Sequence, residues 1–213
     1  QYIRKNGKTL STDNSAISIT GNNSSFYIGS TGSGLYSDGD IAEIIAYVGN
    51  DELQDNQRAK IESYLAIKYG YTLDSSLGGT AGNYVNSNNV TTWNAADNTN
   101  YHNDVMGLSR DDASDLNQKQ STTRDAGFSV YLGSLSAYNG QNSATISNDL
   151  SSLFVGHNQG LLNDPTVGAT TEKPSGILSR LEREWKLTNT NFTDDFAIKI
   201  EPDNWDFDIN DIR

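Results

Sequence analysis

The chain has 213 residues, a formal net charge of −12 and no cysteine, so disulfides and cysteine-based metal sites are excluded. The acidic balance comes without any Lys/Arg cluster, which argues against nucleic acid as a partner. No apolar run approaches the roughly 20 residues that a membrane-spanning helix needs. The length is enough for one large or two small domains.

The composition predicts a mainly β fold. Gly, Ser, Thr, Asn and Asp are abundant, and these residues favour turns between short strands. The chain also has 11 Tyr, which together with Thr supports strands. The chain begins in a polar, strand-like segment and stops at Arg213, so we expect it to be an internal part of a longer protein.

Residues 1–50 are expected to form short antiparallel strands, with strand patterns at residues 17–19 and 26–28. The segment 41–48 is apolar on both strand parities, which predicts a strand buried on both faces. Glu43 lies inside this segment, so its carboxylate must be paired or hydrogen-bonded.

A helix is predicted over residues 53–69. Apolar and long side chains recur there at helical spacing, at Ile61, Tyr64, Leu65 and Lys68. Asp51 is the expected N-cap, and Gly70 has the residue type that commonly ends a helix in the left-handed conformation. We expect this helix to pack beside a β-sandwich.

Residues 74–103 are rich in Gly and Asn, which predicts a linker or a long loop anchored by Trp93. A second series of strands comes after it. Its apolar or alternating runs lie at residues 105–108, 128–132, 153–155, 181–187 and 196–200. Such short strands separated by turn residues predict a β-sandwich over residues 104–213.

Two sequence blocks carry a family resemblance. The text GDIAEIIAY at 39–47, followed by ELQDNQRAKIESYLAIKYGYTL at 52–73, resembles the last strand and following helix of laminin-G-like, or concanavalin A-like, jelly rolls. That version of the jelly roll occurs in large secreted proteins of Bacteroidetes and marine Gram-negative bacteria. VMGLSRDDASDLNQKQS at 105–121 and SRLEREWKLTNTNF at 179–192 are similar to the segments after the helix in the same proteins.

The resemblance implies a division of the chain into four parts. Residues 1–50 would be the C-terminal strands of a jelly roll, 51–73 the connecting helix, 74–103 the linker or long loop, and 104–213 a second β-sandwich truncated at its end. The fold class is therefore mainly β, with one connecting amphipathic helix between the jelly-roll end and the second sandwich. The first half of that jelly roll is expected outside this chain.

The resemblance also implies a function. It indicates a non-catalytic structural and adhesive module of a large secreted or cell-surface bacterial protein. Its expected partners are neighbouring domains of the same protein, and glycans or surface proteins, with calcium stiffening a junction. The alternative is a carbohydrate-binding module that serves a polysaccharide-degrading enzyme.

An acidic segment near the C-terminus is a candidate calcium site. It contains alternating oxygen side chains, at Asp203, Asp206, Asp208, Asn210 and Asp211. Ca²⁺ takes 6–8 oxygen ligands in flexible geometry, although this run lacks the Gly and Glu of an EF-hand loop. The alternative is a solvated acidic linker.

The polar loop with Arg110, Asp111 and Asp112 is a second candidate, either for a ligand or for Ca²⁺. Its structural alternative is an Arg–carboxylate pair with turn-capping side chains. Aromatic residues in Gly/Asn/Ser-rich loops could stack on sugar rings, and the candidates are Tyr36, Trp93, Tyr101 and Tyr138. For each of them taken alone, a core or loop-anchoring role is favoured over contact with a sugar.

Catalytic patterns are weak. His102 and His157 are the only histidines, and no G-x-S-x-G elbow accompanies them. Glu43 and the Glu182/Glu184 pair could be glycosidase carboxylates, but their spacing departs from the jelly-roll glycosidase pattern. We therefore expect a non-enzymatic protein.

Overall fold

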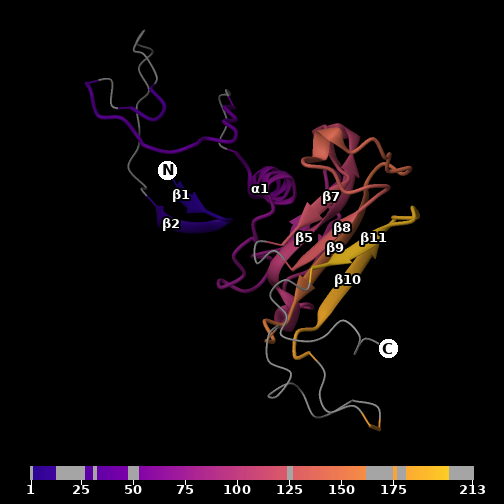
Figure 1. The fold of residues 1–213 in the computed structure, drawn as a ribbon. Coiled ribbons are helices and arrows are strands. Elements are labelled where there is room, and N and C mark those ends of the chain that lie inside the picture. The colour runs from indigo at the N-terminus through magenta and orange to yellow at the C-terminus, as the bar shows by residue number, and fades with distance from the viewer. Residues whose placement is uncertain are drawn as a thin grey trace.

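The computed structural model describes residues 2–12, 27–30, 33–47, 53–123, 127–161, 175–176 and 181–201. Within these ranges the protein is mainly β, with antiparallel sheets and one α-helix, which confirms the predicted fold class (Figure 1).

Two antiparallel sheets form a sandwich. The larger has the order β10-β9-β5-β6, and the smaller has the order β11-β8-β7. The larger sheet contains β5 (Asn103–Asp111), β6 (Leu116–Gln118), β9 (Ser151–His157) and β10 (Trp185–Thr190). The smaller contains β7 (Gln120–Thr122), β8 (Phe128–Tyr131) and β11 (Ala197–Ile200).

Alternate residues of the central strands β5 and β9 serve two different cores, because successive side chains of a strand point to opposite faces. Leu153 and Val155 face the smaller sheet, whereas Phe154 faces the other way. The core between the sheets contains Met106, Leu108, Phe128, Val130, Leu132, Ile146, Leu153, Val155 and Phe192.

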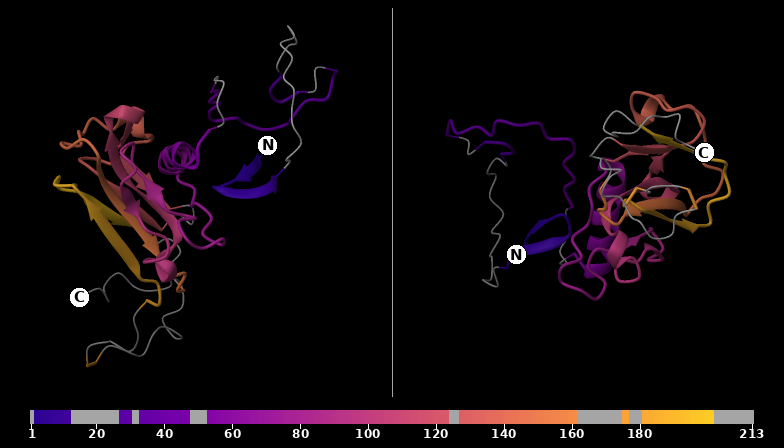
Figure 2. Two further views of the ribbon diagram at one scale, coloured as in Figure 1. Left: turned by 180° about the vertical axis from the view of Figure 1, so that it is seen from behind. Right: turned by 60° about the horizontal axis from the view of Figure 1, so that its bottom comes forward.

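A third layer covers the outer face of the larger sheet. It contains α1 (Asp55–Tyr69) and the small hairpin of β3 (Tyr84–Val85) and β4 (Thr91–Trp93), and the helix contacts β5 and β6. The left view of Figure 2, taken from behind the view of Figure 1, also shows the helix beside the sheets. Its core contains Ala66, Ile67, Leu73, Tyr84, Trp93, Val105, Leu116 and Phe154. The segment 74–103 is thus part of this layer, with Tyr84 and Trp93 at 0% and 1% exposure.

The helix agrees with its prediction except at the first cap. It begins at Asp55 with Gln54 as N-cap, whose backbone N–H donates to Gln57 Oε1 at 2.9 Å. The predicted Asp51 N-cap is therefore wrong, because a Gln54/Gln57 capping box closes the first turn instead. Gly70 ends the helix with φ +66°, as predicted.

A hairpin of β1 (Tyr2–Lys5) and β2 (Lys8–Thr12) lies on the side of α1 away from the sandwich (Figure 1). Its turn is Asn6–Gly7, a dipeptide typical of tight hairpins. Arg4 Nε donates to Glu62 Oε1 at 2.6 Å, so an ion pair fastens the hairpin to the helix.

The segment 41–47 differs most from its prediction. It forms no strand, and Ile41, Ile44 and Tyr47 are 55%, 52% and 63% exposed. No strand among the described residues lies beside it to pair its backbone, so its apolar faces have no sheet to enter. The predicted strand at 26–28 also fails for Tyr27 and Ile28, which lie outside any strand. Residues 17–19 lie outside the described ranges.

The strand predictions of the second half are confirmed at four places, where β5 and β9 contain the predicted runs and β8 and β11 cover all but one residue of theirs. The fifth strand begins later than predicted, at Trp185, which pairs with His157. The side chain of Asn158 accounts for this later start. It donates to the Glu182 carbonyl and accepts the Glu184 backbone N–H, and these bonds hold residues 182–184 outside the strand. The short 3₁₀ helices are η1 (Thr99–Tyr101), η2 (Asp112–Ser114) and η3 (Asn139–Gln141).

Candidate ligand-binding cavity

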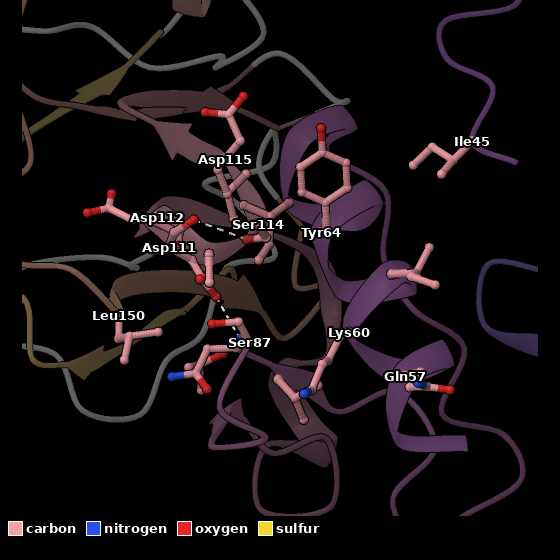
Figure 3. A pocket seen from close by; sticks show the side chains of 18 of the residues that line it. Ile45, Gln57, Lys60, Tyr64, Ser87, Asp111, Asp112, Ser114, Asp115 and Leu150 are labelled. Carbon is pink, nitrogen blue, oxygen red and sulfur yellow. Dashed lines mark hydrogen bonds between the residues drawn. The ribbon is translucent and has the colours of Figure 1, made fainter. Parts of the chain in front are cut away.

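A cavity of about 710 Å³ lies between α1 and the connection from β5 to β6 (Figure 3). Ser87, two residues after β3, lines one side, and Lys60 and Tyr64 line it from the helix. The volume is within the usual range of about 300–1,000 Å³ for small-molecule sites. The wall combines apolar side chains with a few polar groups.

The carboxylate of Asp111 is the most buried charged group of this wall. Asp111 ends β5 and is only 3% exposed. Its Oδ2 accepts the Ser87 backbone N–H at 2.7 Å, and its main-chain carbonyl accepts the Ser114 hydroxyl at 3.1 Å. The bond from Ser87 fixes the carboxylate, and the bond from Ser114 fixes the main chain of Asp111; both are drawn in Figure 3.

Two polar atoms of the cavity wall have no hydrogen-bond partner among the described residues. They are Asp111 Oδ1 and Ser87 Oγ, and both are fully buried from solvent. Buried polar groups are nearly always hydrogen-bonded, and a buried carboxylate without its full set of partners is costly. Because less than 1 Å² of either atom is accessible to solvent, both lie beneath the surface of the wall rather than facing the cavity.

A polar network joins the rim of the cavity to the helix. Glu43 accepts hydrogen bonds from Tyr69 Oη at 2.8 Å and from Lys68 Nζ at 3.1 Å, as its predicted pairing requires. Tyr64 Oη accepts from Lys68 at 2.6 Å and lies 3.4 Å from Glu43. The bonds from Tyr69 and Lys68 lower the pKa of the Glu43 carboxyl, and the bond to Tyr64 raises the pKa of Lys68.

Arg110 and Asp112 form the structural pair that the sequence offered as the alternative to a ligand loop. Arg110 donates to both carboxylate oxygens of Asp112 at 2.8 Å, and also to the Ile146 carbonyl at 2.9 Å. The hydrogen bonds from Arg110 lower the pKa of Asp112. Asp111 and Asp112 both line the cavity, and both carboxylate oxygens of Asp112 accept hydrogen bonds from Arg110.

The aromatic candidates form no single group, because Trp93 and Tyr101 belong to one core whereas Tyr36 and Tyr138 are exposed. Tyr36 and Tyr138 are 81% and 60% exposed, whereas Tyr101 donates to Glu184 Oε2 at 3.0 Å. Trp93 is 1% exposed, so its candidacy for sugar contact was wrong. Its indole instead fills the core of the third layer, where neighbouring loops exclude solvent.

The predicted calcium ligands between Asp203 and Asp211 lie outside the described residues. Within the described ranges, His, Asp and Glu side chains form no group of three that could hold a metal ion.

Both histidines take part in structural hydrogen bonds. His102 Nδ1 accepts the Trp93 indole N–H at 2.9 Å, and its Nε2 donates to the Leu73 carbonyl at 2.7 Å. His157 is 2% exposed, with Nε2 at 2.9 Å from Asp104 Oδ2 and Nδ1 accepting the Gln159 N–H at 3.0 Å. Neither ring has a serine hydroxyl among these partners.

Acidification is expected to destabilise the protein through His102. Burial lowers the pKa of this imidazole, so the folded protein binds the proton less readily than the unfolded chain does. Its contribution to stability is therefore present above the unfolded pKa of about 6.5 and is lost as the pH falls below that value. Urea unfolding at closely spaced pH values from 7.5 to 5 measures this slope.

The matched variant is His102→Gln, which removes the titration. Its free energy of unfolding should be lower throughout but flatter with pH below about 6.5. Equal slopes for the two proteins would contradict the role of His102.

The cavity was only partly visible in the sequence. Asp111 was a candidate because it lies in an acidic loop, but Ser87, Lys60 and Tyr64 were not assigned to a site. No sequence signal links Ser87 to Asp111, which lies 24 positions further along the chain. Lys60 and Tyr64 share a helix face, a spacing that could have placed them together.

The fold and the cavity define a β-sandwich domain with a helix packed on the outer face of its larger sheet. Residues 57–211 match a family described as a domain of unknown function, DUF8202, and the chain belongs to this family. The matched range joins the helix and the sandwich, which share one core. No curated protein and no solved structure matches the chain. Within the described ranges, the helix is too short and too polar to cross a bilayer.

Proposed function

We propose that this protein is a non-catalytic structural and adhesive module of a large secreted or cell-surface bacterial protein. Neighbouring domains of the same protein, and glycans or surface proteins, would be its partners. The resemblance of residues 39–73 to the end of a laminin-G-like jelly roll supports this proposal. The exposed apolar side chains of 41–47 support it too, since a neighbouring domain would cover them.

One observation carries the proposal: side chains suited to catalysis are engaged in structural bonds, while a cavity of the size of a small-molecule site lies beside the helix. His102, His157 and Arg110 each hold parts of the fold together. The cavity beside α1 has a wall that combines apolar side chains with polar groups. That division suits a protein that binds rather than one that reacts.

The same cavity favours a second candidate, a carbohydrate-binding module that serves a polysaccharide-degrading enzyme. Such a module needs hydrogen-bonding groups beside apolar surface, and the cavity wall contains both. The two candidates differ in the larger protein around the domain rather than in the chemistry of the site.

Calcium belongs to the proposal through the acidic segment 203–211. Alternating Asp oxygens there would hold a hard cation and stiffen the junction with the next domain. Binding to the folded state alone would stabilise it by about 2.7 kcal/mol at a hundredfold excess over the Kd.

Retention on insoluble polysaccharides tests the function directly. The full chain is incubated with cellulose, chitin and cross-linked mannan, in Ca²⁺ or in EDTA, and both bound protein and released reducing ends are measured. We expect retention on at least one polysaccharide, stronger in Ca²⁺, with no release of reducing ends. Glu43→Gln is the matched variant for hydrolysis, and reducing ends that rise with time and vanish in this variant would refute a non-catalytic module.

A further inference from the structure

We propose that residues 205–209 pair with the free edge of β11 and complete the smaller sheet of the sandwich. β11 is the end strand of the order β11-β8-β7, so only β8 pairs with it among the described residues. Residues 202–213 come directly after this region in the chain and lie outside the described residues. The pairing is independent of the proposed function, because it concerns how the domain itself is completed.

The outer side of β11 has backbone groups to offer. The Glu201 N–H donates to the Gly127 carbonyl at 3.0 Å, so the backbone of Glu201 faces β8. Backbone groups alternate between the two sides of an antiparallel strand, so those of Lys199 also face β8, and those of Ile198 and Ile200 face the open edge. No described strand meets them there. Such a row of groups is a template for one more strand.

The apolar side chains of β11 are also only partly covered. Ile198 and Ile200 pair with Val130 and Phe128, so they project from the same face of the sheet as these two core residues. Val130 and Phe128 are buried, yet each isoleucine is 41% exposed. Figure 1 shows β11 at the outer edge of the sandwich. The core between the sheets is thus open at this edge, because no described strand beyond β11 closes it.

The sequence of residues 205–209 has the pattern of a strand with one apolar face. Three apolar residues alternate with two acids, in the order Trp205, Asp206, Phe207, Asp208 and Ile209. Strict alternation of this kind predicts a half-buried strand. The family match covers residues 57–211, so the whole segment lies within the matched domain.

A turn sequence connects β11 to this segment. Residues 201–204 are Glu-Pro-Asp-Asn. Proline favours the second position of a type I turn because its φ is fixed, and Asp and Asn are frequent turn residues. Hairpin loops of four residues are most often built around a type I turn. Such a loop would return the chain antiparallel along the free edge of β11.

A four-residue loop also gives a register in which apolar side chains meet. They form three cross-strand pairs: Trp205 with Ile200, Phe207 with Ile198, and Ile209 with Phe196. Directly opposite residues project from the same face, so the new apolar side chains would lie beside the exposed ones of β11. The added strand would therefore cover the opening of the core.

The charges on the other face agree with this register. Lys199 projects from that face of β11 and forms an ion pair with Glu201. Asp206 would lie directly opposite Lys199, and opposite charges stabilise such a cross-strand pair. A shift by one residue would instead place Asp206 against Ile198 or Ile200 and bring its charge to the apolar face.

Cross-linking between introduced cysteines tests the pairing, and the native chain has no cysteine to interfere. Ala197→Cys/Asp208→Cys puts the thiols at a directly opposite pair without mutual hydrogen bonds, where the Cα atoms come closest. Ala197→Cys/Asp211→Cys is the matched control, with the same residue types exchanged but the second thiol on the other strand face. Both full-length variants are oxidised in EDTA, which keeps calcium from the acidic segment, and mass spectrometry after alkylation counts the free thiols.

We expect the variant with Asp208→Cys to form its disulfide within one chain at least roughly tenfold faster than the control. A flexible tether alone would bring both pairs of thiols together at similar rates, whereas a paired strand holds one pair at disulfide distance. Circular dichroism checks that both variants are folded before oxidation.

Thermal unfolding gives a second test that needs no cysteine. Phe207→Ser removes the ring that would cover Ile198, and it should lower the unfolding midpoint by roughly 3–12 °C. Ile212→Ser is the control, because it removes an apolar side chain outside the proposed strand and should leave the midpoint unchanged.

Two results would overturn the proposal: equal oxidation rates in the two cysteine variants, or equal midpoints for Phe207→Ser and Ile212→Ser. A disulfide that joins two chains, seen as a dimer on a non-reducing gel, would overturn it as well. That result would show that the edge of β11 pairs with a second copy. The polysaccharide assay tests the proposed function separately, so none of these outcomes decides it.

Discussion

Trp93→Ala is expected to lower the free energy of unfolding by about 3–5 kcal/mol, the usual cost of removing a large aromatic side chain from a core. The indole is 1% exposed and packs in the core between α1 and the larger sheet. Its loss also leaves His102 Nδ1 without the N–H that it accepts at 2.9 Å. An unsatisfied buried acceptor adds to the cost of the cavity.

Chemical and thermal unfolding followed by circular dichroism measures this effect. In a domain of this size each kcal/mol shifts the midpoint by roughly 2–4 °C, so a fall of roughly 6–20 °C is expected. Tyr138→Ala is the matched control, because it removes an aromatic ring that is 60% exposed. Surface changes of that kind stay within about 0.5 kcal/mol. Similar midpoints for the two variants would contradict the structural role of Trp93.

Gly156→Ala is expected to destabilise the sandwich by about 3 kcal/mol or more, although it adds a single methyl group. Gly156 lies in β9, between two paired strands. A Cβ atom there would overlap the Tyr101 carbonyl oxygen and lie 2.9 Å from Trp93 Cη2. Overpacking costs about 1–3 kcal/mol in general, and a clash with backbone lies at the upper end because a carbonyl cannot rotate away.

Unfolding by urea again gives the measurement, and tryptophan fluorescence reports on the indole that the new methyl group would displace. Gly39→Ala is the control, since a Cβ atom at that position meets no atom within 4 Å. A Gly156→Ala variant as stable as Gly39→Ala would show that β9 and the indole are packed more loosely than described.

Sequence patterns predicted the elements whose burial is arranged locally. The helix of residues 55–69 was foreseen because its apolar positions recur at helical spacing and Gly70 comes directly after it. The strands β5, β8 and β9 were foreseen because short apolar runs between turn residues have few other stable conformations. The mainly β fold class was predicted from the same short apolar runs and from the turn-rich composition.

The segment 41–47 shows what such patterns do not predict. Its two apolar parities predict a strand buried on both faces, yet Ile41, Ile44 and Tyr47 remain exposed. A pattern records which side chains need cover, whereas a strand also needs a neighbour to bond its backbone, and that neighbour is distant in sequence. Glu43 was expected to be paired, and its carboxylate does accept hydrogen bonds from Tyr69 and Lys68, although the buried strand on which that expectation rested did not form.

By itself the sequence determined the mainly β class, the helix, most strands of the second half and the absence of disulfides, since each depends on residue type and on spacing over a few positions. Only the tertiary structure decided that Trp93 is a core residue, that Arg110 binds Asp112, and that Asp111 meets Ser87 at a cavity. These outcomes depend on which distant segments share a surface. Burial and hydrogen-bond satisfaction are properties of that shared surface, and the spacing of residues along one segment does not specify them.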